Sequence, residues 1–293
     1  MPTCDVCFRQ CKIEEGQTGF CGARTCRDEQ LVAANYGRLT SVALDPIEKK
    51  PLKMFHPGSM ILSLGSYGCN LRCPFCQNSS ISWSQKAFEY KDKAEYYEPQ
   101  EIVKTALDLR SRGNIGLAFT YNEPLVGYEF VRDTARLAKE SGLQNVLVTN
   151  GTASQKILNQ ILPYIDAMNI DLKAFTDSFY RNFIGGDFQM VKDFITGATK
   201  SCHVELTTLI IPGENDSEEE MRKLSVWVAS LENQTGKKNP ASYYKVLSGL
   251  QTYRQGTNTC EQNPAACRSC KRKPGLCFSG EYLAGGVTGA SPR

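Results

Sequence analysis

The sequence has no long hydrophobic run. Nowhere do about 18 apolar residues follow one another, so we expect no membrane-spanning helix. The first residues lack the basic region followed by an apolar region that marks a signal peptide, which predicts a cytoplasmic protein. A strong charge of either sign is also missing, because the net charge is only +3 and no dense block of Lys and Arg occurs. We therefore expect neither a nucleic-acid nor a membrane partner.

What the sequence has in excess is cysteine, with 13 residues in three clusters and Cys202 alone. The chain of 293 residues is 41% hydrophobic and 22% charged, which suits one α/β domain with a small appendage. A chain of this length buries a core without disulfides, so we expect reduced thiols, whose tight spacing favours metal binding. The clusters are Cys4/Cys7/Cys11/Cys21/Cys26, Cys69/Cys73/Cys76 and Cys260/Cys267/Cys270/Cys277.

From residue 60 onward, apolar runs of strand length alternate with longer segments of helical period. This alternation predicts parallel strands joined by helical crossovers, in either a barrel or an open doubly wound sheet. The predicted strands cover 61–66, 115–120, 145–149, 167–172 and 204–211. The predicted helices cover 99–112, 125–141, 153–163, 176–199 (with Gly185-Gly186 as a candidate break) and 216–232. The pattern stops near Lys237, after which only Tyr243–Leu247 has strand character.

The central cysteines have the spacing Cys69-x3-Cys73-x2-Cys76 and follow the first predicted strand. They therefore lie on a loop at the carboxyl end of a strand, where sites of parallel α/β folds collect. Three thiolates suit an iron–sulfur cluster or zinc, and the spacing alone does not separate the two. No fourth ligand is supplied locally, so a cubane cluster would keep one iron open for a chelating small molecule.

With Phe75 before its third cysteine and a βα repeat around it, this loop resembles the radical SAM (S-adenosylmethionine) superfamily. The resemblance implies a partial (β/α)6 TIM-like barrel in which Cys69, Cys73 and Cys76 ligate a [4Fe–4S] cluster and SAM chelates the fourth iron. An electron delivered by a donor such as flavodoxin or ferredoxin cleaves SAM to methionine and a 5′-deoxyadenosyl radical. That radical abstracts hydrogen from a substrate, which makes the chain an oxidoreductase whose cofactors carry the hard chemistry.

Polar motifs follow the next three predicted strands. Asn122 and Glu123 lie in an element similar to the family's Gly-Gly-Glu-Pro, which implies contact with the SAM ammonium, although Tyr-Asn replaces Gly-Gly here. Asn150 is expected to hydrogen-bond the SAM ribose. Asp171 and Lys173 form an Asp-x-Lys element similar to that of radical activating enzymes, which implies that they face SAM. Singly, each motif also fits a helix start, a turn or a solvated lysine, but their repetition at successive strand ends is hard to obtain by chance.

The N-terminal segment, with its cysteines and the run Asp45-Pro-Ile-Glu-Lys-Lys-Pro-Leu52, is similar to AmmeMemoRadiSam-system radical SAM enzymes, over about residues 1–236. These are often described as homologues of pyruvate formate-lyase activating enzyme, which makes a protein substrate one option. We expect zinc or a second cluster on the N-terminal cysteines, with unligated thiols as the alternative. The candidate ligands are Cys4, Cys7, Cys11 and Cys21.

The C-terminal segment departs from that family, which continues with a sequence like Pro-Leu-His-Leu-x-Arg-Phe-x-Pro. We hypothesise a frameshift near Lys238, because a back-translation of 239–270 read one base later can yield Ile-Leu-His-Leu-Thr-Thr-Arg-Phe-Tyr-Pro. The last four clustered cysteines would then be accidental, and the barrel would lack its closing strand. We expect a Cys-rich extension (1–58), a radical SAM barrel (59–236) and an atypical C-terminal segment (237–293). Three other functions stay open: a glycyl-radical-enzyme activase, a zinc module without catalysis, and a pseudoenzyme.

Overall fold

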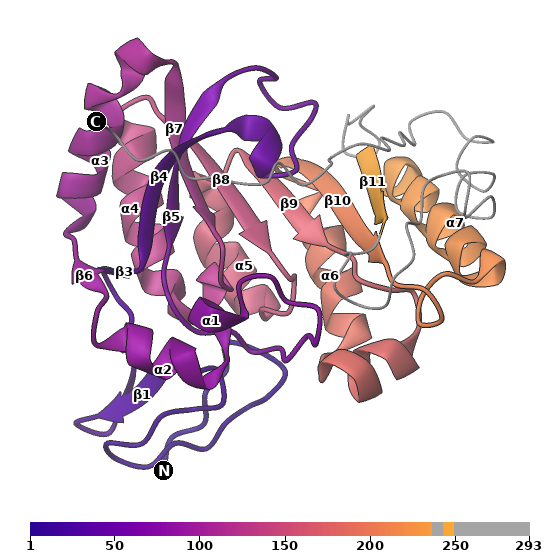
Figure 1. Ribbon diagram of the computed structural model, residues 1–293, viewed down its shortest axis with the longest axis horizontal. Helices are drawn as coiled ribbons and strands as arrows, with labels where there is room; N and C mark the ends of the chain where they lie inside the picture. The colour runs from indigo at the N-terminus through magenta and orange to yellow at the C-terminus, as the bar shows by residue number, and fades with distance from the viewer. Residues whose placement is uncertain (236–242, 249–293) are drawn as a thin grey trace, which may run out of the picture.

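The alternating apolar segments fold into one twisted sheet with helices packed against it (Figure 1). The structure is a computed structural model that describes residues 1–235 and 243–248. The strand order is β11-β10-β9-β8-β7-β5-β4, in which β4 pairs antiparallel with β5 and every other pair is parallel. The strands are β4 (Ser41–Pro46), β5 (Met60–Gly65), β7 (Asn114–Thr120), β8 (Gln144–Thr149), β9 (Ala167–Asp171), β10 (His203–Ile210) and β11 (Tyr243–Ser248).

Most of the helices are crossovers between these parallel strands. The predicted helix 176–199 is divided, as expected, at Gly185, whose φ of 65° is a conformation that glycine adopts without strain. A π-helical turn, Phe179–Ile184, precedes the break, and Asp187 restarts the helix by accepting the N–H of Met190 at 2.8 Å. The α-helices are α1 (Ser79–Ser82), α2 (Gln85–Lys91), α3 (Pro99–Asp108), α4 (Tyr128–Glu140), α5 (Gln155–Ile161), α6 (Phe188–Ala198) and α7 (Glu218–Thr235).

Short strands that the sequence pattern does not predict lie in two small sheets. A hairpin pairs β1 (Arg24–Arg27) with β2 (Gln30–Ala33), and β3 (Arg38–Leu39) pairs with β6 (Glu95–Tyr96). They are too short for the apolar alternation that marks a strand in sequence. Single turns of 3-10 helix cover Ile47–Lys49, Arg110–Arg112, Pro124–Gly127 and Leu162–Tyr164.

The predicted α/β fold with a partial six-stranded parallel barrel is confirmed. The sheet does not close on itself in the described residues, since β4 and β11 are its two edges. The expectation that the barrel lacks its closing strand is wrong. In this chain Tyr243–Ser248 forms β11, the sixth parallel strand, which pairs with β10. The rest of the predicted C-terminal segment, with its four clustered cysteines, lies outside the described residues.

The predicted N-terminal extension shares the sheet with the barrel. Strand β4 lies within residues 1–58, yet it pairs along its whole length with β5, from Ser41 opposite Gly65 to Pro46 opposite Met60. The division of the chain at residue 58 therefore stays a prediction, because the segments before and after that residue contribute neighbouring strands to the same sheet. Among the described residues, no helix combines the length and apolar character needed to cross a bilayer.

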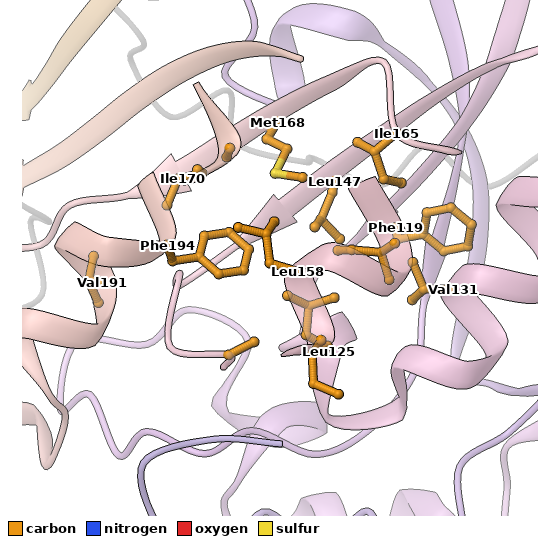
Figure 2. Packing of buried hydrophobic residues seen from close by; sticks show 14 of the residues in the cluster. Phe119, Leu125, Val131, Leu147, Leu158, Ile165, Met168, Ile170, Val191 and Phe194 are labelled. Atoms are coloured by element: carbon orange, nitrogen blue, oxygen red, sulfur yellow. The ribbon is translucent and has the colours of Figure 1, made fainter. Parts of the chain in front are cut away.

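The main core lies between the sheet and helices α4, α5 and α6. Figure 2 shows side chains of the strands, among them Leu147 and Met168, meeting those of the helices, among them Leu158 and Phe194. These four side chains are completely buried. Truncation of a core phenylalanine such as Phe194 to alanine typically costs about 3–5 kcal/mol, so this layer holds the strand ends in place.

The segment after β4 crosses the opening at the start of the parallel strands. Ile47 and Leu52 are fully buried in a small cluster with buried residues of β5, β7, β8 and β9. The carboxylate of Glu205 accepts the main-chain N–H groups of Lys53 and Met54 at 2.8 and 2.9 Å. This segment, residues 47–54, therefore closes the interior of the sheet on the side opposite the carboxyl ends of the parallel strands. It is called the floor below.

Candidate functional site

The carboxyl ends of β5, β7, β8 and β9 meet around one cavity of about 540 Å³, a size suited to a small-molecule ligand. Each predicted motif follows a different strand, and the parallel pairing places those strand ends side by side. The structure brings every residue predicted for the cluster and for SAM onto the wall of this cavity. These residues are Cys69, Cys73, Cys76, Asn122, Glu123, Asn150, Asp171 and Lys173.

The loop that carries the three central cysteines is shaped by its own main chain. Gly68 has a φ of 98°, and a Cβ added there would meet Ala23 at 2.8 Å and the carbonyl oxygen of Cys21 at 2.9 Å, so glycine is required. Two N–H groups point at the Cys69 sulfur: the main-chain N–H of Leu71 at 3.4 Å and the amide of Asn150 at 3.8 Å. Hydrogen bonds to cysteine sulfurs are typical of iron–sulfur ligands, whose potential they tune.

Burial raises the pKa of the Cys73 thiol to about 11 and raises that of Cys69 as well. Thiols in such a setting ionise when a cation binds them, because a coordinating metal deprotonates the thiol outright. The chemistry of this donor set fits a positively charged inorganic group: three soft sulfur ligands lie on one loop beside a cavity, with N–H donors aimed at one of them. The three sulfurs do not converge on the position of a single metal ion.

Glu123 is the most constrained acidic residue of the site. The residue is 3% exposed, and its carboxylate accepts hydrogen bonds from the hydroxyl of Thr149 at 2.7 Å and from the N–H groups of Asn150 and Leu125 at 2.8 and 3.1 Å. Burial raises its pKa to about 7, although these three hydrogen bonds oppose the shift. The carboxylate thus ties the end of β7 to the end of β8, and a nearby cation would favour its ionised form.

Asn122 supports the cysteine loop. Its side-chain oxygen accepts the N–H of Ser66 at 3.1 Å, and its amide donates to the carbonyls of Tyr67 and Gly68 at 3.2 and 3.1 Å. Since both ends of this side chain are used by the loop that precedes Cys69, its geometry suits positioning of that loop.

Asn150 and its neighbours form a second set of polar bonds against the same loop. The Asn150 amide donates to the side-chain oxygen of Asn70 at 2.9 Å, and Asn70 in turn donates to Thr152 at 2.8 Å. All three residues are buried. The turn after β8 is therefore held rigidly against the cysteine loop.

Asp171 and Lys173 form an ion pair at 2.8 Å at the end of β9. Burial lowers the pKa of Lys173, but the neighbouring Asp171 carboxylate outweighs burial and raises it above its ordinary value, so the ammonium stays charged. The amide of Asn215, in the loop after β10, donates to the Lys173 carbonyl at 2.7 Å and fixes the main chain there.

The N-terminal cysteines line a separate, narrow cavity of about 10 Å³ beside the cysteine loop. The two features are in contact, because the Cys69 N–H donates to the Cys21 carbonyl at 3.1 Å. Within the part of the chain that the structure describes, no three His, Cys, Asp or Glu side chains converge closely enough to hold a single metal ion. The predicted N-terminal metal therefore stays a prediction. The cysteines that line the narrow cavity are Cys4, Cys7, Cys11 and Cys21.

Four residues that sequence reasoning did not assign to the site line the floor side of the large cavity. They are Asp45, Lys49, Lys50 and Tyr121. The first three lie in the run that follows the N-terminal cysteines, and Tyr121 replaces the first glycine of the family's Gly-Gly-Glu-Pro element. The signals in the sequence were that replacement and the run from Asp45 to Leu52, neither of which predicts a contact between Asp45 and Tyr121.

Comparison with known proteins gives a consistent match. Residues 64–225, more than half of the chain, match the family described as the Radical SAM superfamily. An uncharacterized protein of Methanocaldococcus jannaschii is 42% identical over 217 residues, which cover 73% of this chain and 62% of that protein. The pyruvate formate-lyase 1-activating enzyme of Escherichia coli (strain K12) is 24% identical over 172 residues, covering 57% of this chain and 67% of the enzyme. The chain thus spans less than two thirds of its archaeal relative.

Solved structures share the fold at low sequence identity. Streptococcus suis SuiB has a TM-score of 0.55 and 12% identity, over 76% of this chain and 50% of that one. The FeFe-hydrogenase maturase HydG from Carboxydothermus hydrogenoformans has a TM-score of 0.52 and 12% identity, over 73% of this chain and 52% of that one. These likenesses confirm the predicted barrel-like architecture.

Proposed function

Because this chain belongs to the radical SAM superfamily, we propose that it holds a [4Fe–4S] cluster on Cys69, Cys73 and Cys76 and binds SAM beside it. When bound, the cluster supplies the electron that cleaves SAM to methionine and a 5′-deoxyadenosyl radical, which takes a hydrogen atom from the substrate. One observation carries the proposal: the three thiols and all five predicted SAM contacts, drawn from four strand ends, line one cavity.

The chain's own residues have distinct roles in this proposal. The Lys173 ammonium, held by Asp171 at 2.8 Å, is the cation available to the SAM carboxylate. The buried Glu123 carboxylate offers a negative charge near the SAM ammonium and sulfonium groups. In this proposal Asn150, whose amide donates to Asn70 at 2.9 Å, orients the ribose.

A second candidate within the same chemistry is activation of a glycyl-radical enzyme, in which the hydrogen comes from a glycine of a partner protein. It is supported by the similarity to the pyruvate formate-lyase activating enzymes of Escherichia coli and Clostridium pasteurianum, at 24% and 26% identity. A flavodoxin or a ferredoxin is then the expected electron donor. Electron paramagnetic resonance of reduced enzyme, SAM and a candidate partner protein tests it, because a glycyl radical gives its own spectrum.

The test of the main proposal is anaerobic reconstitution with iron and sulfide, followed by dithionite and SAM. We expect a brown protein that releases 5′-deoxyadenosine. Cys73→Ala is the loss variant and Cys202→Ala is its matched control, because both residues are 7% exposed but only Cys73 lines the cavity. We expect Cys73→Ala to lose the cluster and the product, and Cys202→Ala to keep both.

Two outcomes would refute the proposal. A colourless wild-type preparation that binds zinc alone would point to a zinc module without catalysis. A brown wild-type preparation that binds SAM but yields no 5′-deoxyadenosine would point to a pseudoenzyme. Equal iron content in Cys73→Ala and the wild type would remove Cys73 from the ligand set.

A further inference from the structure

The floor of the large cavity carries a cluster of charged groups that the proposed chemistry at the cysteine loop does not use. Asp45, Lys49, Lys50 and Tyr121 line the cavity there. We propose, as an extension that rests on the proposed function, that this cluster anchors the substrate by an anionic group, a carboxylate or a phosphate. The four residues are called the floor cluster below.

The floor cluster is centred on the Asp45 carboxylate. Lys50 donates to one of its oxygens at 2.9 Å, Lys49 to the other at 3.1 Å, and the Tyr121 hydroxyl donates to the first at 2.5 Å. Two ammonium groups thus face one carboxylate, which leaves one positive charge unbalanced within the cluster. A surplus cation on the wall of a cavity is what an anionic ligand group requires.

Lys50 is a buried cation, with only 1% of its side chain exposed. Burial lowers its pKa, and the Asp45 carboxylate opposes that shift. A buried charge is expensive for a protein to keep, and a buried ion pair is weak evidence for a gain in stability. Its position on a cavity wall, with its ammonium 4.4 Å from the centre of the Tyr121 ring, is therefore better explained by ligand binding.

Lys49 supplies the donors that a ligand can reach. Its side chain is 66% exposed, and its partner among the described residues is Asp45 alone. An ammonium group has three N–H donors, so two of them face outward from the pair. Lys49 can therefore bind an incoming anion without first breaking its bond to Asp45.

Tyr121 connects the floor cluster to the cysteine loop. Its φ of 73° is a left-handed conformation that costs a tyrosine energy and that is retained mainly at functional sites. Gly65 makes room for the ring, since a Cβ there would lie 2.7 Å from its Cδ2 atom. The Tyr121 carbonyl accepts the side-chain amide of Asn78, just beyond the third cysteine, at 2.9 Å. An anion held on the floor would thus lie along the wall that leads to the proposed SAM site.

Other charges on the cavity wall do not supply the same function. Lys173 is paired with Asp171, and Glu123 is buried and fully hydrogen-bonded. These groups lie at the strand ends, where the proposal for SAM already uses them. On the described cavity wall, the floor cluster is the part in which the cations outnumber the carboxylates, with two lysines and one aspartate. The substrate group that it fits is therefore an anion.

The test is isothermal titration calorimetry at low ionic strength, where charge pairs are least screened. The protein is the cluster-reconstituted, SAM-saturated enzyme without reductant, and the probes are inorganic phosphate and malonate. The variants are Lys49→Met and Tyr121→Phe, which avoid the buried Lys50. Lys53→Met is the matched control, because it removes the same charge four residues away from Lys49 and outside the cavity wall.

We expect one probe to bind the wild type and Lys53→Met equally, and Lys49→Met to bind it at least about tenfold more weakly, the effect of one charge-assisted hydrogen bond. Tyr121→Phe should weaken binding as well. A preference for malonate assigns a carboxylate substrate, and a preference for phosphate assigns a phosphorylated one. If neither probe binds the wild type, or if Lys49→Met and Lys53→Met bind alike, the inference is overturned. Release of 5′-deoxyadenosine by the same wild-type protein reports separately on the proposed function.

Discussion

The carboxylate of Glu123, at the end of β7, accepts the main-chain N–H of Asn150, at the end of β8, at 2.8 Å. The same carboxylate accepts the hydroxyl of Thr149 and the N–H of Leu125. A residue expected to contact the cofactor is therefore also the clamp between two strand ends. Substitutions there should affect stability and SAM binding together.

Glu123→Gln should lower the free energy of unfolding by about 1–3 kcal/mol, because the glutamine amide would place a donor against N–H and O–H donors that are buried. Urea unfolding of the two proteins measures the loss, and SAM affinity should fall with it. Glu140→Gln is the control: that residue forms an exposed pair with Arg136, and its change should stay within about 0.5 kcal/mol. An unchanged midpoint for Glu123→Gln would show that the clamp is dispensable.

Lys173→Met should weaken SAM binding by about tenfold, because it removes the cation proposed for the SAM carboxylate and leaves Asp171 facing it. Equilibrium dialysis of SAM with the reconstituted protein is the measurement. Lys104→Met, an exposed change on α3, removes the same charge and should bind SAM like the wild type. Equal affinities for the two variants would place Lys173 outside the SAM site.

Asp45→Asn should destabilise the protein by about 3 kcal/mol at pH 7, because it leaves the buried Lys50 ammonium without its carboxylate. Burial alone would raise the pKa of Asp45, but hydrogen bonds from Lys50, Tyr121 and Lys49 hold it well below the ordinary 3.8. A carboxyl with a lowered folded pKa stabilises the fold above its unfolded pKa and loses that contribution as the pH falls below it. The difference in the free energy of unfolding between the wild type and Asp45→Asn should therefore be constant from pH 7 to about pH 5 and should shrink below about pH 4.

Urea unfolding at several pH values measures this difference. Asp5→Asn is the control, because Asp5 and Lys156 form a pair in which both side chains are more than half exposed, and its effect should stay below about 1 kcal/mol. A difference for Asp45→Asn that is independent of pH down to pH 3 would mean that the carboxylate charge does not stabilise the pair.

The N-terminal cysteines provide a separate prediction about metal content. A variant with Cys69, Cys73 and Cys76 all replaced by alanine should retain a metal, zinc or iron, detectable by inductively coupled plasma mass spectrometry. Further replacement of Cys7, which lines the narrow cavity, should remove it, whereas replacement of Cys26, which is buried outside that cavity, should not. A triple variant without bound metal would show that the cysteines of the narrow cavity are free thiols. These are Cys4, Cys7, Cys11 and Cys21.

The sequence by itself determined the fold class and the cysteine loop. Strand periodicity, helix breaks such as Gly185 and the spacing from Cys69 to Cys76 are all local, so they can be predicted from a few neighbouring residues. The motifs around Glu123 and Lys173 could be found for the same reason, because each follows its own strand directly and parallel strands bring their ends together.

Only the tertiary structure decided what those residues contact. Asp45 and Tyr121 are 76 positions apart, and they meet because β4 pairs with β5 and β5 pairs with β7. The register of those pairs sets which side chains share the interior of the sheet, and a one-residue slip would turn each of them to the opposite face. No local pattern encodes that register. The cysteine loop was therefore predictable, while the charged floor under it was not.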